Sequence, residues 1–240
     1  MATNIPDTTA IRPPETADNV FASAMMRTMK AMRRLRNLLR GLRDGMLPAY
    51  WRVARRWFTT RDAWAYVEHP VPYHYFGPGS LHEFSWYLEG PSSVSVSSVE
   101  DIERWLLGCA YRSDQALFGE SDLWLHPGHF EQLRKGDCED HAIWAWRKLK
   151  DLGIPARLFA GRRIVSVNSG VGFHAWVVLE RDAQPWLFET TAFLYRRMLR
   201  PLDEVRALYI PHYSVDHDGV VRMYCGHVKS GRELRAPAGQ

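Results

Sequence analysis

The sequence predicts an α+β fold, in which helices come first along the chain and an antiparallel sheet follows. Three observations support this prediction. Apolar residues recur at helical spacing in several segments up to residue 152, strand-like apolar segments lie between residues 157 and 189, and a turn dipeptide at 218–219 separates two short strand-like runs. With 240 residues, 46% of them hydrophobic, the chain can bury one sizeable core.

The first 60 residues differ from the rest in charge. They hold eleven Arg and Lys against four Asp and Glu, a net charge of +7, whereas the remaining residues hold twenty against twenty-three, a net charge of −3. Residues 1–20 are predicted to be a disordered leader. From Phe21 to Gly45, a stripe of Met and Leu side chains surrounded by Arg predicts a basic amphipathic helix. We therefore expect an N-terminal basic helical arm, residues 1–60, and a main domain, residues 61–240.

Three interpretations of the basic arm stay open. The helix packs on the domain by its apolar face, binds an acidic partner or nucleic acid, or lies on a membrane surface.

No segment has the about 18 apolar residues needed to span a membrane. Residues 1–20 lack the basic start and the apolar stretch of a secretory signal. We expect a soluble, cytoplasmic protein without a transmembrane segment.

Local sequence patterns predict the structure of the segment that precedes Gly136. Residues 64–90 are aromatic and turn-rich, which predicts irregular structure packed on the core. Ser97 with Glu100 matches the S-x-x-E capping box and predicts a helix that begins there. The three cysteines lie far apart without a CxxC pair, so a disulfide framework is not expected; one Cys109–Cys225 bridge stays open, although free thiols in a reducing cytosol fit more simply.

The next helix carries the main chemical candidate. Gly136 and Asp137 lead Cys138 into its first turn, and apolar residues then recur at helical spacing until Gly153. At a helix N-terminus the backbone N–H groups are unpaired and the helix dipole is positive. Such a position favours the thiolate form of a cysteine and can hold the oxyanion of a tetrahedral intermediate. We infer that Cys138 is a nucleophile.

Strand-like segments at 157–167, 173–179 and 186–189 carry the partners of this thiol. His174 opens the second segment, and Glu189 ends the third. An imidazole on a rigid strand can act as general base, and a carboxylate on the next strand can orient it. Each residue alone is a weak signal, because a lone Cys or His more often belongs to the core.

Together, the order G-D-C-E-D-H-A, F-H-A-W-V and W-L-F-E-T-T resembles the transglutaminase-like superfamily of papain-related folds, in particular its bacterial cysteine-proteinase branch. The resemblance covers roughly residues 100–195, including Asp122-x-Trp124-x-x-Pro127 ahead of the cysteine. It implies a nucleophile helix packed on an antiparallel sheet, with Cys138 as nucleophile, His174 as general base and acid, and Glu189 as third member. The family usually has Asp in the third position, so Glu189 departs from its pattern.

Two features of the site stay open. Candidates for the second oxyanion donor are Gln132, Gln115 and Trp124. The carboxylates of Asp137, Glu139 and Asp140 either complement the helix dipole or bind calcium, as acidic residues do in a calcium-dependent branch of the resembled family. No other cofactor is expected, and no histidine pair has the spacing of a zinc site.

The predicted function is that of a cysteine hydrolase, a peptidase or amidase, acting on a protein or peptide through a thioester on Cys138. Two alternatives stay open. A lysine amine in place of water would make the protein a transamidating acyl-transferase. A fold that has lost its activity would be a non-catalytic binding module, with the basic arm engaging an acidic partner.

Overall fold

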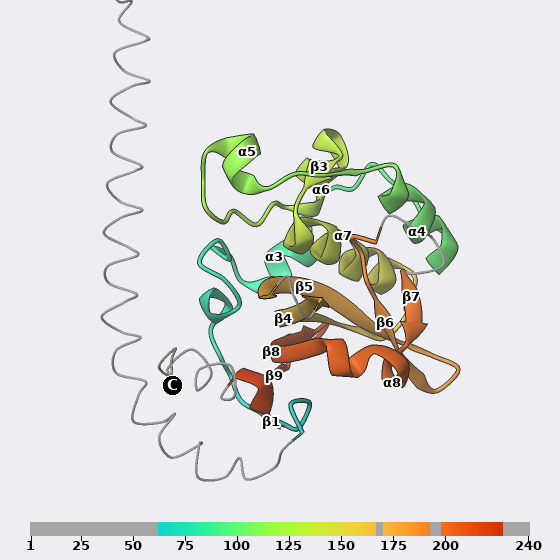
Figure 1. Cartoon of the computed structure of the whole chain (residues 1–240). Coiled ribbons are helices and arrows are strands. Elements are labelled where there is room, and N and C mark those ends of the chain that lie inside the picture. Colours follow the sequence, from blue (N-terminus) through green and yellow to red (C-terminus); the bar gives the residue numbers. More distant parts are fainter. Residues whose placement is uncertain (1–61, 167–169, 193–197, 228–240) are drawn as a thin grey trace, which may run out of the picture. The chain divides into compact units, whose positions relative to one another are not determined.

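A computed structural model describes residues 62–166, 170–192 and 198–227 (Figure 1). The strands are β1 (Tyr66–Glu68), β2 (Ala110–Tyr111), β3 (Lys135–Gly136), β4 (Ala156–Ser166), β5 (Gly170–Arg181), β6 (Gln184–Phe188), β7 (Leu199–Pro201), β8 (Tyr209–Asp216) and β9 (Val221–Tyr224). The α-helices are α3 (Phe84–Leu88), α4 (Val99–Leu107), α5 (Asp114–Phe118), α6 (Pro127–Leu133), α7 (Cys138–Asp151) and α8 (Leu202–Val205), and the short 3₁₀ helices are η1 (Tyr73–Tyr75) and η3 (Arg206–Leu208). The predicted α+β fold is confirmed.

A seven-stranded sheet in the order β1-β9-β8-β4-β5-β6-β7 forms the centre of the described structure. All of its neighbouring strands pair antiparallel. In the β4–β5 hairpin, Gly161 lies opposite His174, and in the β4–β8 pair Arg163 lies opposite Tyr209. The register therefore places the start of β8 and the end of β4 close to the histidine of β5.

Helix α7 packs on β4 and β5 and is almost entirely buried (Figure 1). The predicted helical spacing of its apolar residues is confirmed, because Ile143, Trp146 and Leu149 are fully buried. The indole of Trp144 stacks on Trp105 of α4 with ring centroids 3.9 Å apart, and Trp146 Nε1 donates to the Ala156 carbonyl at 3.3 Å. These contacts fix α7, and with it Cys138, against the sheet.

A buried ion pair holds α6 on α7. Lys148 Nζ lies 3.1 Å from Glu131 Oε1, and the two side chains are 1% and 0% exposed. The same carboxylate accepts hydrogen bonds from the Ser92 hydroxyl, the Ser93 amide and the Trp144 indole. A buried charge is tolerated only when its partners are satisfied in this way, so the loop at 92–93 and both helices are fixed together.

Two local predictions were wrong in detail. Helix α4 begins one residue later than the Ser97–Glu100 pattern predicted, because the Ser98 hydroxyl accepts from the Asp101 amide at 3.1 Å. Residues 64–90 are not wholly irregular, since they contain β1, which pairs with β9, and helix α3.

Some predictions concern residues that the structure does not describe. The arm, residues 1–60, lies outside the described residues, so its helix, its partner and the domain boundary stay predictions. Cys109 and Cys225, both within the described residues, are not joined by a disulfide. Among the described helices, none has the length and apolar character required to cross a membrane.

Candidate active site

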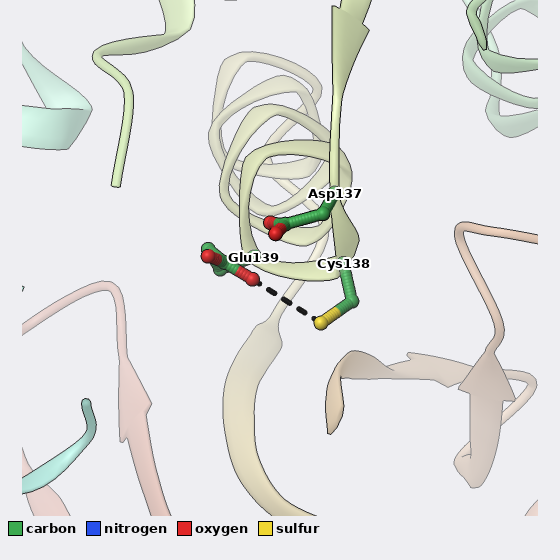
Figure 2. Close-up of side chains that lie close together, drawn as sticks. All are labelled: Asp137, Cys138 and Glu139. Atoms are coloured by element: carbon green, nitrogen blue, oxygen red, sulfur yellow. Dashed lines mark hydrogen bonds between the residues drawn. The ribbon is translucent and has the colours of Figure 1, made fainter. Parts of the chain in front are cut away.

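Cys138 is the first residue of α7 and is half-buried. Its thiol donates to Glu139 Oε2 at 3.2 Å, and the carboxylate of Asp137 lies on the same side of the helix end (Figure 2). Because the first turn of a helix leaves its N–H groups without intrahelical partners, the sulfur lies beside donors that can bind an oxyanion.

Close packing at Gly136 fixes the start of α7. The Asp140 carboxylate accepts from the Asp137 amide at 3.3 Å and from the Leu125 amide at 2.8 Å. A Cβ at position 136 would lie 2.3 Å from Asp140 Oδ2, closer than side chains approach one another. Glycine at this position therefore lets Asp140 turn back over the helix start, which sets the place of Cys138.

The structure brings His174 and Glu189 together. His174 Nε2 lies 2.9 Å from both carboxylate oxygens of Glu189, and the two side chains are 10% and 4% exposed. Burial alone would lower the pKa of His174, but the charge of Glu189 and hydrogen bonds with Cys138 and Glu189 outweigh it and raise this pKa to about 9. With Nε2 bonded to Glu189, Nδ1 is the ring nitrogen left for the thiol.

Glu189 follows β6 directly and is bound by several donors besides His174. Thr191 Oγ1 donates to Oε1 at 2.7 Å, the Tyr209 hydroxyl donates to Oε2 at 2.7 Å, and Arg163 lies 3.1 Å from Oε2. Burial alone would raise the pKa of Glu189, but the charge and hydrogen bond of His174, together with Arg163 and Thr191, lower it to about 2. The carboxylate is therefore held in its charged form. Asp216 is instead bonded to Arg157 and Asp182 is exposed, so neither competes for this place.

Asp114 and Asp122, which the sequence did not indicate as calcium candidates, lie close to the three carboxylates beside the nucleophile. Candidate ligand atoms lie within 4.8 Å of one another in each of three groups, which are Asp137, Cys138 and Glu139; Asp114, Asp137 and Asp140; and Asp114, Asp122 and Glu139. Among the described residues, none of these groups includes a histidine. We call the set of Asp114, Asp122, Asp137, Glu139 and Asp140 the acidic cluster.

The acidic cluster is crowded and poor in compensating charge. Burial and the charge of Asp137 raise the pKa of Asp114 to about 7, and burial with neighbouring charges raises the pKa of Glu139 and Asp140 well above their usual range. No salt bridge joins any of the five carboxylates to another described residue. Oδ1 of Asp114 and Oδ1 of Asp137 are buried without a hydrogen-bond partner in this part of the chain.

The oxyanion candidates occupy different surroundings. Trp124 is buried and its Nε1 donates to Asp122 at 3.2 Å, whereas Gln115 of α5 and Gln132 of α6 are exposed. Tyr111 also lies near Cys138, and the sequence did not indicate it as a residue of the site. Strand β2 pairs with β3 so that Tyr111 lies opposite Gly136, and burial followed by the charges of Cys138 and Asp137 raises the pKa of its phenol. A two-residue strand gives no periodic signal by which Tyr111 could have been found.

Part of the chain matches a known protein family. Residues 86–188 match the family model of the transglutaminase-like superfamily. The matched segment includes Cys138, His174 and strands β4, β5 and β6, and it ends one residue before Glu189. Residues 86–188 are therefore similar to the transglutaminase-like superfamily. A comparison with curated proteins gave no significant match.

Solved structures with low sequence identity also resemble the chain. Calcium-bound LapG from Legionella pneumophila is 20% identical, with a TM-score of 0.41, over 53% of this chain and 67% of that one. A second LapG structure from the same organism is 22% identical, with a TM-score of 0.41, over 57% and 72% of the two chains. A candidate cysteine protease from Cytophaga hutchinsonii is 17% identical, with a TM-score of 0.34, over 65% and 54%.

Proposed function

We propose that the protein is a cysteine hydrolase that cleaves a peptide or isopeptide amide through a thioester on Cys138. One observation carries the proposal. His174 is bonded through Nε2 to both oxygens of Glu189 at 2.9 Å, and its ring also interacts with the thiol of Cys138 at the N-terminus of α7. An imidazole that is oriented by an acid and lies beside a thiol is the arrangement by which cysteine enzymes generate their nucleophile.

The proposed reaction has two stages. His174 takes the thiol proton, and Sγ of Cys138 bonds to the carbonyl carbon while the N–H groups at the start of α7 hold the oxyanion. The C–N bond then breaks, and His174 gives the proton to the leaving amine. In the second stage a water molecule gives a proton to His174 and attacks the thioester, the C–S bond breaks, and the proton returns to sulfur.

The first test measures thiol reactivity, with the other two cysteines as internal controls. Brief treatment with iodoacetamide near pH 7, followed by peptide mapping, is expected to label Cys138 fastest. Burial raises the pKa of the Cys109 thiol to about 11, and Cys225 is buried, so both should react slowly. The substitution His174→Ala should remove the advantage of Cys138. Equal labelling of all three thiols in the folded protein would mean a non-catalytic binding module.

The second test identifies the reaction. Native protein is incubated with a peptide library, and any acyl-enzyme is captured by mass spectrometry, with Cys138→Ala as the control. Adding a lysine-like amine separates the two outcomes of the same intermediate. Release of free acid supports hydrolysis, whereas transfer of the acyl group to the amine supports the transamidating alternative.

We also propose that the acidic cluster binds a calcium ion. Calcium prefers carboxylate and carbonyl oxygens, and Asp114, Asp122, Asp137 and Glu139 offer carboxylates from three segments. The unpartnered oxygens of Asp114 and Asp137 fit such a ligand, whereas both oxygens of Asp140 already accept backbone hydrogen bonds. When bound, the ion would supply positive charge that offsets the crowded carboxylates.

The calcium proposal is tested by thermal unfolding. Because a ligand that binds only the folded state stabilises it, the melting temperature should rise with calcium concentration and return to its starting value in EGTA. The substitutions Asp114→Asn and Asp137→Asn should reduce this rise. Glu180→Gln, which removes an exposed carboxylate from β5, is the matched control and should retain it. A melting temperature that calcium leaves unchanged would contradict the proposal.

A further inference from the structure

Besides His174, Glu189 is held by two residues that neither the family pattern nor the triad includes. Tyr209 and Arg163 both contact Oε2, at 2.7 Å and 3.1 Å. They lie directly opposite each other in the β4–β8 pair, and the Arg163 guanidinium lies 5.6 Å from the centre of the Tyr209 ring. One cross-strand pair therefore presents two donors to one carboxylate oxygen.

The two donors differ in what they supply. Tyr209 is 4% exposed, and its ring also packs on Trp176 at 5.1 Å, so its hydroxyl is a fixed, neutral donor. The Arg163 side chain is 36% exposed and adds a positive charge that competes with the imidazolium for the same carboxylate. With Thr191 on Oε1 and His174 across both oxygens, each carboxylate oxygen has at least two donors.

We propose that Arg163 and Tyr209 are positioning residues, which fix the Glu189 carboxylate on His174 and, through the Arg163 charge, limit how strongly the imidazole holds its proton. This proposal rests on the proposed function. Glu has one more rotatable bond than Asp, so a triad with Glu needs additional restraint to keep the carboxylate in line with the ring. The Arg163 charge acts in the opposite direction from Glu189, because a cation near an imidazolium disfavours it.

The charge of Arg163 and the alignment by Tyr209 predict different effects of substitution. Arg163→Gln removes a positive charge, so the titration midpoint of His174 should rise by about half a pH unit or more. Tyr209→Phe removes a neutral donor and leaves the charge, so the midpoint should move less. Loss of alignment in Tyr209→Phe should instead slow iodoacetamide labelling of Cys138 near pH 7 by about threefold to tenfold.

The experiment follows His174 directly. Protein labelled with ¹⁵N-histidine is titrated by NMR, the His174 ring resonances are assigned by comparison with His174→Ala, and Cys138 labelling is measured in parallel. Arg162→Gln is the matched control: it makes the same charge change next to Arg163, but its guanidinium lies over the Phe173 ring. Arg163→Lys keeps the charge and should keep the midpoint.

The outcomes separate this inference from the proposed function. If Cys138 of the native protein is no more reactive than Cys109, the proposed function fails. The inference fails, and the proposed function stands, if Cys138 is reactive but the His174 titration midpoint of Arg163→Gln equals that of Arg162→Gln. The same conclusion follows if Cys138 of Tyr209→Phe is labelled at the native rate. Because Tyr209→Phe removes a single oxygen atom from a buried ring, it tests the inference even if Arg163→Gln does not fold.

Discussion

Glu189 meets His174 with both of its carboxylate oxygens, although an aspartate is usual in this position of the family. The longer side chain starts from the residue that directly follows β6, and it reaches Thr191, Tyr209 and Arg163 in addition to the imidazole. The added length therefore serves contacts that a shorter acid would not reach from the same backbone position.

This contact set predicts the effect of changing Glu189. Glu189→Gln keeps the shape but loses the charge, so turnover should fall by roughly 10²–10⁴. Glu189→Asp keeps the charge but withdraws the carboxylate by about one C–C bond length, ~1.5 Å, so its activity should lie below that of the native protein. Turnover of the peptide found in the library experiment is the measurement, with Glu180→Asp of the exposed β5 position as control. An Asp variant as active as the native protein would mean that the length of Glu189 has no role.

The His174–Glu189 pair also predicts a pH window for stability. The pKa of His174 is raised from 6.5 to about 9, so its contribution is complete below pH 6.5 and is lost as the pH rises through 9. The pKa of Glu189 is lowered from 4.5 to about 2, so its contribution is complete above pH 4.5 and is lost as the pH falls through 2.

Chemical unfolding between pH 5 and pH 10 checks this prediction. The free energy of unfolding of the native protein should fall toward pH 10 by more than that of His174→Gln, which lacks the titrating ring. Parallel curves for the two proteins would contradict the pairing of His174 with Glu189.

At the residue scale, the sequence was enough to name three candidate residues for the site, but it did not identify most of the residues around them. Cys138, His174 and Glu189 stand in short motifs, so local pattern was enough to select them, and the structure joins His174 to Glu189 and brings the ring to the thiol. Asp114 begins helix α5 and Asp122 follows that helix, and both meet Glu139 only through tertiary packing. No spacing rule connects residues that the fold alone brings together.

Among the elements, α7 has the most demanding position, because its first turn must carry Cys138. Its start was predicted correctly from Gly136 and Asp137, a combination with few alternatives. The start of α4 was predicted one residue early, because two serines and two acids follow one another there and either pair fits a capping pattern. Burial of Val99, Ile102 and Leu106 then favours the observed register, which local pattern alone could not decide.

The close approach at Gly136 predicts the effect of adding one methyl group. Gly136→Ala would place Cβ 2.3 Å from Asp140 Oδ2, so Asp140 must move and the helix start with it. We expect the free energy of unfolding to fall by about 1–3 kcal/mol and Cys138 labelling to slow. Gly172→Ala on β5 is the control, because nothing lies within 4 Å of its added Cβ. Equal denaturant midpoints for the two variants would contradict this account of the helix start.

At the scale of the whole molecule, the segment that matches the family model, residues 86–188, contains only part of the seven-stranded sheet. Residues 86–188 contain β4, β5 and β6 of the seven-stranded sheet but not β1, β7, β8 or β9. Glu189 and Tyr209 also lie outside the segment. The sequence predicted the long strands from their apolar runs, whereas three-residue β1 is too short to show an alternating pattern.

A chain cut to the family segment should therefore not fold as a stable domain. Residues 86–188 alone would leave β4 without β8, and the Glu189 carboxylate would be absent. We expect residues 62–240 to give a cooperative unfolding transition and residues 86–188 to give none, by circular dichroism on heating. A cooperative transition in the shorter chain would show that the outer strands are dispensable.

Strand β1 has a consequence for association between molecules. It pairs with the outer side of β9 over only three residues, and the Cys225 amide continues the ladder by donating to the Ala65 carbonyl at 2.8 Å. An unpaired strand edge is a template for a strand of another chain, whereas a short edge strand bearing charges, such as Glu68 beside Arg222, resists such pairing. Without β1, the longer and more apolar β9 would become the border of the sheet. Within the described residues, we therefore expect β1 to limit intermolecular strand pairing at this border of the sheet.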